Sequence, residues 1–176
     1  MLMKERMAAL EFDRVINTRI SVRNYLKKDV IIEDIESIIE CGKRAPAACN
    51  LRALETMVIS DESIKKEIVN TTYIGSNDNN DIQSWMLRAP VFLVICMDMK
   101  KCREKYGEDN YKKDAYLNAS ASIENMLLKA VDLGLGSCYV TGFREKELAG
   151  FLNIDDNKEV IAILTLGYED KNNKFI

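Results

Sequence analysis

The order of apolar and polar residues changes its period several times along the chain, and each change predicts a boundary of a helix or strand. Ile35, Ile38 and Ile39 recur at helical spacing, which predicts a helix from about Ile32 to Cys41 that stops at Gly42. A longer pattern of the same kind predicts a helix from about 114 to 133. Its apolar face is expected to hold Tyr116, Ala119, Ile123, Leu127, Ala130 and Val131.

Shorter patterns predict the remaining elements. Further helices are expected through about Asn17 (with Met7 and Leu10 in its pattern), from Ser63 after a cap at Asp61 or Ser63, and over about Arg144–Leu152. Strands are expected over Thr56–Ile59, Val91–Cys96, Ser137–Val140 and Val160–Leu166. Because the run 91–96 is apolar on both faces, it predicts a central strand that is covered on both sides. Helices interleaved with buried strands predict a sheet with helices on both faces.

Length and composition limit the class of protein. A chain of 176 residues, of which 47% are hydrophobic, predicts one globular domain over residues 1–176. The net charge of -3 argues against a protein that binds nucleic acid through its phosphates. The longest apolar run, Val91–Met97, is much shorter than the roughly 20 residues that cross a bilayer, so no membrane partner is expected.

The sequence contains no histidine. This excludes Ser-His-Asp and Cys-His catalytic groups and the zinc and iron sites that histidine builds, so no metal site is expected. Five cysteines without a C-x-x-C pair, and a charged N-terminus without a signal-peptide pattern, favour the cytoplasm. An enzyme of this composition depends on carboxylates, Cys, Lys, Tyr, backbone groups or a cofactor that carries the reactivity itself.

The segment from Arg19 to Tyr25 combines cations with an alternating pattern. In extended backbone one side carries Arg19, Ser21, Arg23 and Tyr25, and the other side carries Ile20 and Val22 as anchors. Two guanidinium groups beside a hydroxyl predict a receptor for an anion such as phosphate, because the planar fork of arginine donates two hydrogen bonds at once. The alternative is an edge strand with a solvated, charged face.

Three other segments are candidates for ligand contact. Arg44–Asn50 consists of small residues and one amide, and such a segment lets a flat ligand approach the backbone. Leu133–Phe143 leaves the long helix, forms a short strand and reaches Gly142, where backbone N–H groups can face a ligand. The alternatives are an ordinary loop and a structural turn. The polar patch Gly75–Asp81 predicts a loop and is a candidate lid.

In their order and spacing, these motifs resemble the FMN-dependent nitroreductase family. Its members carry R-R-S-x-R-x-[FY], then A-P-S-x-x-N-x-Q-P, then a long helix that runs into G-L-G-x-[CT]-[WY]-x-x-G-F, and a strand that ends in L-G-Y. The matching residues are Arg19, Ser21, Arg23, Tyr25, Ala45, Pro46, Asn50, Gly134, Leu135, Gly136, Cys138, Tyr139, Gly142, Phe143, Leu166, Gly167 and Tyr168. The resemblance covers about Arg14 to Tyr168.

The resemblance implies an α+β fold, a three-layer α/β/α sandwich with a central mixed, mostly antiparallel sheet, and a homodimer with FMN at the subunit interface. Arg19 and Arg23 would bind the phosphate, and Ser21 would reach the flavin or its chain. Asn50 would lie near the isoalloxazine ring of the same or the partner subunit. The complete set of implied FMN-binding residues is Arg19, Ile20, Ser21, Arg23, Ala47, Asn50, Tyr139, Val140, Thr141 and Gly142.

The implied activity is the reduction of nitroaromatics, quinones or related acceptors with NADH or NADPH by a ping-pong mechanism. Thr141 and Gly142 would face the N5 and O4 edge of the flavin, and no side chain is catalytic because flavin N5 carries the chemistry. The choice of electron donor and acceptor would depend on the loop from Tyr73 to Trp85.

The chain also departs from the family pattern. Ile20 stands where a second basic residue is usual, Ala47 replaces the customary Ser, and Arg52-Ala53 replaces Gln-Pro. After the L-G-Y strand only Lys171 or Lys174 could supply the basic phosphate ligand that is common in the family. These departures leave an alternative, a flavin-binding module for sequestration or sensing that does not turn over.

Overall fold

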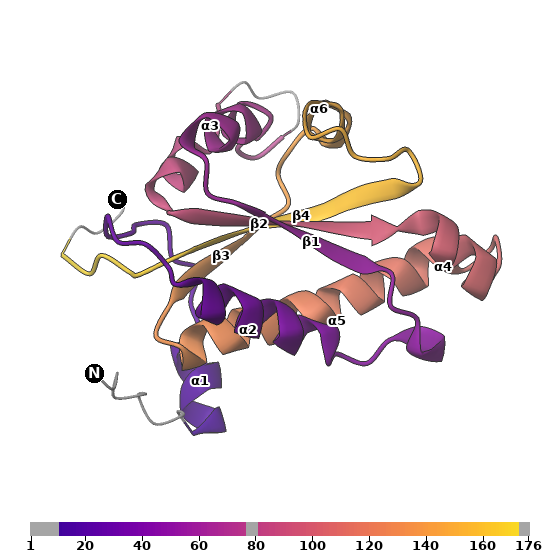
Figure 1. The fold of residues 1–176 in the computed structure, drawn as a ribbon, viewed down its shortest axis with the longest axis horizontal. Helices are drawn as coiled ribbons and strands as arrows, with labels where there is room; N and C mark the ends of the chain where they lie inside the picture. Colours follow the sequence, from indigo (N-terminus) through magenta and orange to yellow (C-terminus); the bar gives the residue numbers. More distant parts are fainter. Residues whose placement is uncertain (1–10, 77–80, 173–176) are drawn as a thin grey trace.

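A computed structural model describes residues 11–76 and 81–172 and shows a molecule of three layers (Figure 1). The middle layer is a four-stranded sheet in the order β1-β2-β4-β3. Each pair of neighbouring strands is antiparallel. The strands are β1 (Leu54–Ile59), β2 (Val91–Asp98), β3 (Gly136–Val140) and β4 (Lys158–Gly167).

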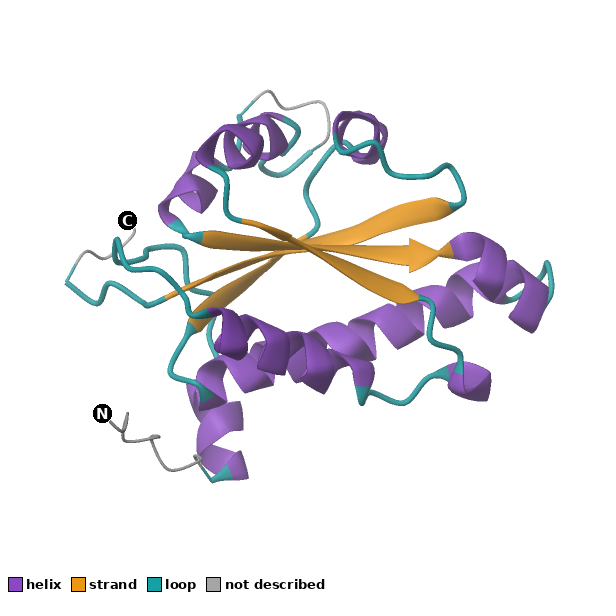
Figure 2. Cartoon of the chain, in the orientation of Figure 1, coloured by secondary structure: helices purple, strands orange, loops and turns teal. Residues whose placement is uncertain are grey.

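Helices cover both faces of the sheet (Figure 2). One outer layer contains α1 (Phe12–Thr18), α2 (Ile32–Lys43) and α5 (Tyr111–Asp132). The other contains α3 (Glu62–Asn70), the 3-10 helix η2 (Ser84–Arg88) and α6 (Glu145–Phe151). A second 3-10 helix, η1 (Ala48–Asn50), precedes β1, and α4 (Met99–Tyr106) follows β2 and packs on α5. This arrangement confirms the α/β/α sandwich.

β2 contributes side chains to the packing on both faces of the sheet. Its side chains alternate between two hydrophobic cores, because successive residues of a strand point to opposite faces. Phe92 and Val94 belong to the core under α3, η2 and α6, whereas Leu93 and Ile95 belong to the core under α2 and α5. All four are fully buried, which confirms a central strand that is covered on both sides.

The structure moves some of the expected helix boundaries. α2 continues past Gly42 to Lys43. A Cβ at Gly42 would overlap the side chain of Met126, so this glycine serves the close packing of α2 on α5 and does not end the helix. α4 was not expected, because charged residues dominate its eight positions and leave little apolar pattern.

The long helix is confirmed, but it begins at Tyr111 and one of its expected core positions is wrong. Tyr116 is 38% exposed, and its hydroxyl donates a hydrogen bond to the Glu159 carboxylate. A tyrosine can lie at a surface in this way because its ring is apolar while its hydroxyl needs a polar partner. Ala119, Ile123, Leu127 and Ala130 are buried as expected.

Several expectations fall partly outside the described residues. The N-terminal helix is seen as α1, while Met7 and Leu10 of its pattern lie outside. Residues 77–80 of the polar loop and Lys174 also lie outside. Within residues 11–76 and 81–172, no helix is long and apolar enough to cross a membrane.

Candidate functional site

The segment from Arg19 to Tyr25 lies along the free edge of β3. The Val22 N–H donates to the Ser137 carbonyl at 2.9 Å, and an isolated parallel bridge joins Ser21 to Ser137. The contact is close because residue 136 is glycine. A Cβ on Gly136 would lie 2.8 Å from a methyl carbon of Val22. The sequence therefore brings the first and third motifs together through backbone pairing.

The predicted alternation in this segment is only partly correct. Ser21 and Arg23 are exposed and Val22 is buried, as expected, but Ile20 is 54% exposed and does not anchor the segment. Tyr25 is buried at 5% exposure on the core side instead of facing solvent beside the arginines.

The Tyr25 hydroxyl explains why this residue breaks the alternation. It donates to the Val22 carbonyl at 2.6 Å and lies 2.7 Å from the Thr165 hydroxyl. Burial raises the pKa of the Tyr25 phenol well above its ordinary value, so the group stays neutral. This side chain fixes the segment to β4, and the segment is therefore more than a solvated edge strand.

The cationic groups of the segment gather around one buried thiol. Burial raises the pKa of Cys138, while Arg23, a hydrogen bond with Ser21, and Arg19 each act in the opposite direction. All three side chains therefore lie close enough to the Cys138 thiol to act on its pKa. The Arg23 guanidinium also lies 5.6 Å from the centre of the Trp85 ring, within the range of a cation–π contact.

A cavity of about 460 Å³ opens beside this cluster. Arg23 and the whole segment Tyr139–Gly142 line it, so the structure brings five of the expected site residues together. The rest of its wall comes from the loop between Tyr73 and Trp85 and includes Tyr73, Gln83 and Trp85. The sequence indicated only that the loop from Tyr73 to Trp85 would matter. It carries no motif that identifies these three residues.

Gln83 connects that loop to the glycine at the end of β3. Its side-chain amide donates to the carbonyls of Tyr73 and Gly142, both at 3.0 Å, and the Tyr73 N–H donates to the Gly142 carbonyl at 3.0 Å. A Cβ on Gly142 would lie 2.9 Å from the Tyr73 carbonyl oxygen. Glycine is therefore required here by close packing against backbone.

The second motif lies elsewhere in the single chain. Ala47 lines a different cavity, at the C-terminal end of α2, and Asn50 is in η1. Cys49 and Asn50 have φ of 50° and 53°, in the left-handed region. The Arg52 guanidinium donates to the Asn50 side-chain oxygen at 2.9 Å and so fixes this amide. Within the described residues, Ala47 and Asn50 of the second motif do not line the cavity around Arg23.

Tyr168, the last residue of the L-G-Y motif, contacts the segment that follows the first motif. The Leu26 N–H donates to the Tyr168 carbonyl at 2.8 Å, and the Lys28 ammonium lies 3.7 Å from the centre of the Tyr168 ring. Lys171 is exposed and does not line the cavity around Arg23. Its role as a phosphate ligand stays a prediction.

Comparisons with known proteins agree with the geometry. Residues 16–168 match the model of the Nitroreductase family. A protein of Archaeoglobus fulgidus, provisionally named NADH dehydrogenase/NAD(P)H nitroreductase, is 31% identical over 88% of this chain and 83% of its own length. The FMN reductase [NAD(P)H] of Bacillus subtilis is 28% identical over 83% of this chain and 56% of its own length.

A solved structure supports the same fold. The crystal structure of a nitroreductase family protein from Clostridium novyi NT superimposes with a TM-score of 0.81 at 24% identity. The alignment covers 95% of this chain and 89% of that one.

Proposed function

The chain belongs to the nitroreductase family, and from this premise we propose that it is an FMN-dependent oxidoreductase. We propose that residues 1–176 act as one FMN-binding domain in the cytoplasm, take electrons from NADH or NADPH, and reduce nitroaromatics, quinones or related acceptors by a ping-pong mechanism. Relatives named as FMN and flavin reductases favour an NAD(P)H-dependent enzyme over a module without turnover. The observation that carries the proposal is the cavity that joins Arg23 to Tyr139–Gly142.

The residues around this cavity fit FMN. The cofactor has an anionic phosphate and a flat ring system. Arg23 lines the cavity, and Arg19 and Ser21 act with it on the nearby Cys138 thiol. Two cations and a hydroxyl are a donor set that suits a phosphate. The volume of about 460 Å³ lies in the range of small-molecule sites, and three aromatic side chains, Tyr73, Trp85 and Tyr139, line it.

When bound, FMN supplies the two-electron chemistry at its N5 atom. The protein's own residues bind and orient the cofactor and exclude water from it. The Arg23 guanidinium lies within cation–π distance of Trp85, and Gln83 fixes the Gly142 carbonyl against the Tyr73 backbone. Fixed dipoles and a fixed cation need no rearrangement when a ligand arrives, and such preorganisation is the main contribution that a protein without a titrating catalytic group can make.

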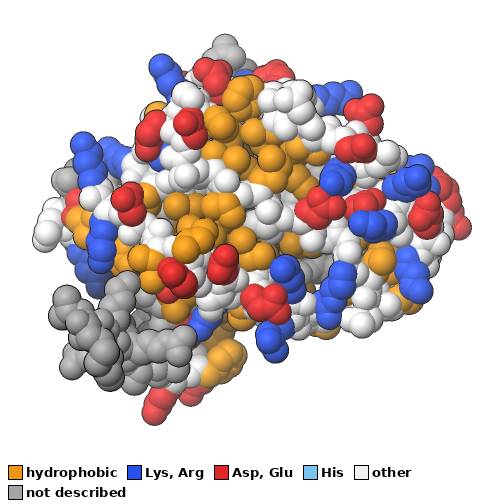
Figure 3. All heavy atoms as spheres, viewed as in Figure 1, with side chains coloured by type: hydrophobic (Ala, Val, Ile, Leu, Met, Phe, Trp, Pro, Cys, Tyr) orange, Lys and Arg blue, Asp and Glu red, His pale blue; other side chains and the backbone are white. Residues whose placement is uncertain are grey.

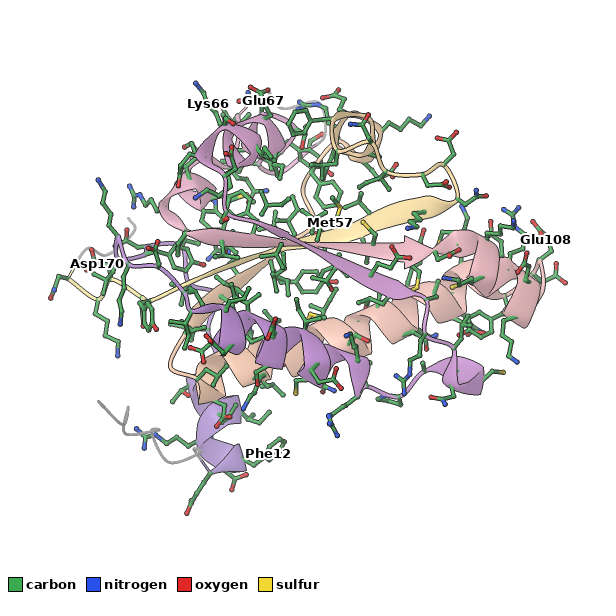
Figure 4. All side chains as sticks on the ribbon, in the orientation of Figure 1. Phe12, Met57, Lys66, Glu67, Glu108 and Asp170 are labelled. Atoms are coloured by element: carbon green, nitrogen blue, oxygen red, sulfur yellow. The ribbon has the colours of Figure 1, made fainter. Side chains whose placement is uncertain are left out.

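We further propose a homodimer in which the second motif of one chain approaches the cavity of the other. One chain leaves Ala47 and Asn50 away from Arg23. Large apolar side chains on the outer helix layer remain exposed, among them Phe12 at 70%, Ile16 at 45% and Leu117 at 61%. Phe12 projects from α1, beyond the helices that cover the sheet (Figure 4). A second copy of the chain would bury this surface.

An anaerobic absorbance spectrum tests the proposed function directly. FMN-saturated protein should show the flavin band, and stoichiometric NADH or NADPH should bleach it. A quinone or nitroaromatic acceptor should then restore the band. Protein that binds FMN but is bleached by neither nucleotide would support the module without turnover, and protein that does not bind FMN would contradict both. Light scattering during gel filtration gives the mass, and a monomer would contradict the homodimer.

A further inference from the structure

A third cavity, of about 470 Å³, lies where the segment from Tyr25 to Asp29 meets the first turn of α3 and the end of η2. Its volume is within the range of small-molecule sites. None of its lining residues belongs to the cavity around Arg23 or to the one beside Ala47. The proposed dimer contacts, on α1, α5 and the loop around Asn50, do not line it either, so a ligand here is compatible with the homodimer.

The lining of this cavity includes a buried cation, Lys65. Its side chain is 1% exposed. The ammonium donates to the Ala89 carbonyl at 2.9 Å and to the Pro90 carbonyl at 3.5 Å. It also lies 2.7 Å from the Glu62 carboxylate and 5.7 Å from the centre of the Phe92 ring. Because burying an unpaired charge is costly, this ammonium requires an anionic partner.

The anionic partner that the ammonium has in the structure is able to move away. The Ala89 and Pro90 carbonyls belong to the backbone, whereas the Glu62 side chain is 77% exposed. Within the described residues, no other carboxylate lies within 4.0 Å of the Lys65 ammonium. An exposed side chain that is held by one ion pair can leave it at little cost. Glu62 therefore marks a position where an anionic oxygen of a ligand can replace it on Lys65.

The rim of the cavity adds further positive charge. Lys27, Lys28 and Arg88 line it, and all three are exposed. Together with the buried ammonium, the lining carries four cations against two carboxylates, those of Asp29 and Glu62. Figure 3 shows Lys and Arg side chains along the left edge of the molecule, where Figure 1 draws the segment that leads into α2. The excess of cations favours a ligand with more than one negative charge.

The lining also has an apolar part. Leu26 and Leu87 belong to it, and they are 42% and 36% exposed. The ring of Pro90 lies in the same lining. A ligand with an apolar group would remove these side chains from water, which stabilises the complex in proportion to the area that is covered. The cavity therefore offers charge and apolar surface to the same molecule.

We propose that this cavity binds a small phosphate monoester whose organic group is apolar. One phosphate oxygen replaces the Glu62 carboxylate on the Lys65 ammonium, and the three exposed cations of the rim balance the second charge. A phosphate monoester carries close to two negative charges at pH 7, and lysine binds phosphate as a point charge. The organic group covers the two exposed leucines. A carboxylate would bring only one charge to four cations, and inorganic phosphate would leave the leucines in water. The site does not depend on the flavin proposed above.

The first test is calorimetry with phenyl phosphate, on protein that has been loaded with FMN and separated from unbound FMN. One site per chain is expected. Inorganic phosphate should bind at least about 10-fold more weakly, because it leaves the apolar lining exposed to water. Phenol has the ring without the charges and should show no binding at the same concentrations. Equal affinity of phenyl phosphate and inorganic phosphate, or of phenyl phosphate and phenol, would overturn the proposal.

A variant of the competing carboxylate gives the sharpest test. Glu62→Gln should bind phenyl phosphate about 10-fold more tightly, because the ligand then displaces a neutral amide in place of a charged oxygen. A gain in affinity cannot come from loss of the fold. Glu67→Gln removes the same charge from the same helix, and Glu67 does not line the cavity (Figure 4). Unchanged affinity in Glu62→Gln, or an equal gain in Glu67→Gln, would overturn the proposal.

Two further variants separate this site from the cavity around Arg23. Lys27→Gln should weaken phenyl phosphate about 5-fold, the most that an exposed ion pair contributes. Arg23→Ala should leave the affinity unchanged, because Arg23 lines the other cavity. An affinity that falls in Arg23→Ala and not in Lys27→Gln would assign the ligand to that cavity and overturn the proposal. These comparisons hold whether or not the protein retains FMN, so failure here is distinct from failure of the proposed function.

Discussion

The cavity around Arg23 and the loop from 45 to 53 both contain motif residues, but different contacts hold them. The first is built on backbone pairing at the edge of β3 and on two glycines that allow close approach. The second is held by the side chains of Arg52, Tyr106 and Asn118, which occupy its backbone groups and the amide of Asn50. The first is therefore expected to be rigid in any sequence that keeps its glycines, whereas the second depends on single polar side chains.

The largest expected effect comes from removing the cations of the first region. The double variant Arg19→Ala, Arg23→Ala should raise the Kd for FMN by at least about 100-fold, because each lost charge-assisted hydrogen bond costs about 1.5–3 kcal/mol. Flavin fluorescence quenching measures the Kd. Lys66→Ala serves as a control for charge alone, and an unchanged Kd in the double variant would refute the phosphate assignment.

The next largest effect tests the close packing at Gly142. Gly142→Ala should lower the free energy of unfolding by about 1–3 kcal/mol, since its Cβ meets the Tyr73 carbonyl oxygen and the backbone must shift. Gly150 is the matched control, because nothing lies within 4 Å of a Cβ there. Gly150→Ala should be stabilising by about 0.5–1 kcal/mol, as expected for a glycine within a helix. Urea denaturation measures the free energy of unfolding of both variants. Similar changes in the two would contradict the requirement for close packing at Gly142.

A smaller and local effect is expected in the second region. Asn118→Ala leaves the Ala48 N–H without its acceptor and the Tyr106 hydroxyl without its amide donor, at a cost of about 1–2 kcal/mol. Hydrogen exchange should accelerate in residues 46–52, while the emission of Trp85, the single tryptophan, should not change. Asn125→Ala, on the same helix, removes only a bond to the Cys41 carbonyl and should leave that loop protected.

The smallest effect concerns two thiols, one in each region. Cys49 is exposed and should react with a disulfide reagent at pH 8. The Cys49→Ser variant should lack this kinetic phase of the reaction. Cys138 is buried, and burial raises its pKa, so it should react only after unfolding. Because the folded pKa lies above the unfolded value of 9.0, its contribution to stability is complete below pH 9 and is lost as the pH rises further. Cys138→Ala should flatten that alkaline decline.

Periodicity was sufficient for the elements whose pattern is local. The isoleucines of α2 and the apolar run of β2 are examples, since burial on one or two faces leaves a direct trace in the order of residues. α4 left no such trace, because it packs through Met99 and Cys102 within a charged segment. In the site, the motifs predicted that Arg23 and Tyr139–Gly142 belong together. Tyr73, Gln83 and Trp85 could not be identified, because their contacts join segments that are distant in sequence.

The bridge between Ser21 and Ser137 also has a consequence for the order in which the protein is made. The ribosome releases the arginine segment well before β3, so the two halves of the cavity around Arg23 meet only after Ser137 has been made. Contacts between such distant parts of a chain form slowly, after the entropy of closing the intervening loop has been paid. A nascent chain that has not reached β3 therefore has no such cavity, and any ligand that the cavity holds is acquired after β3 has been made.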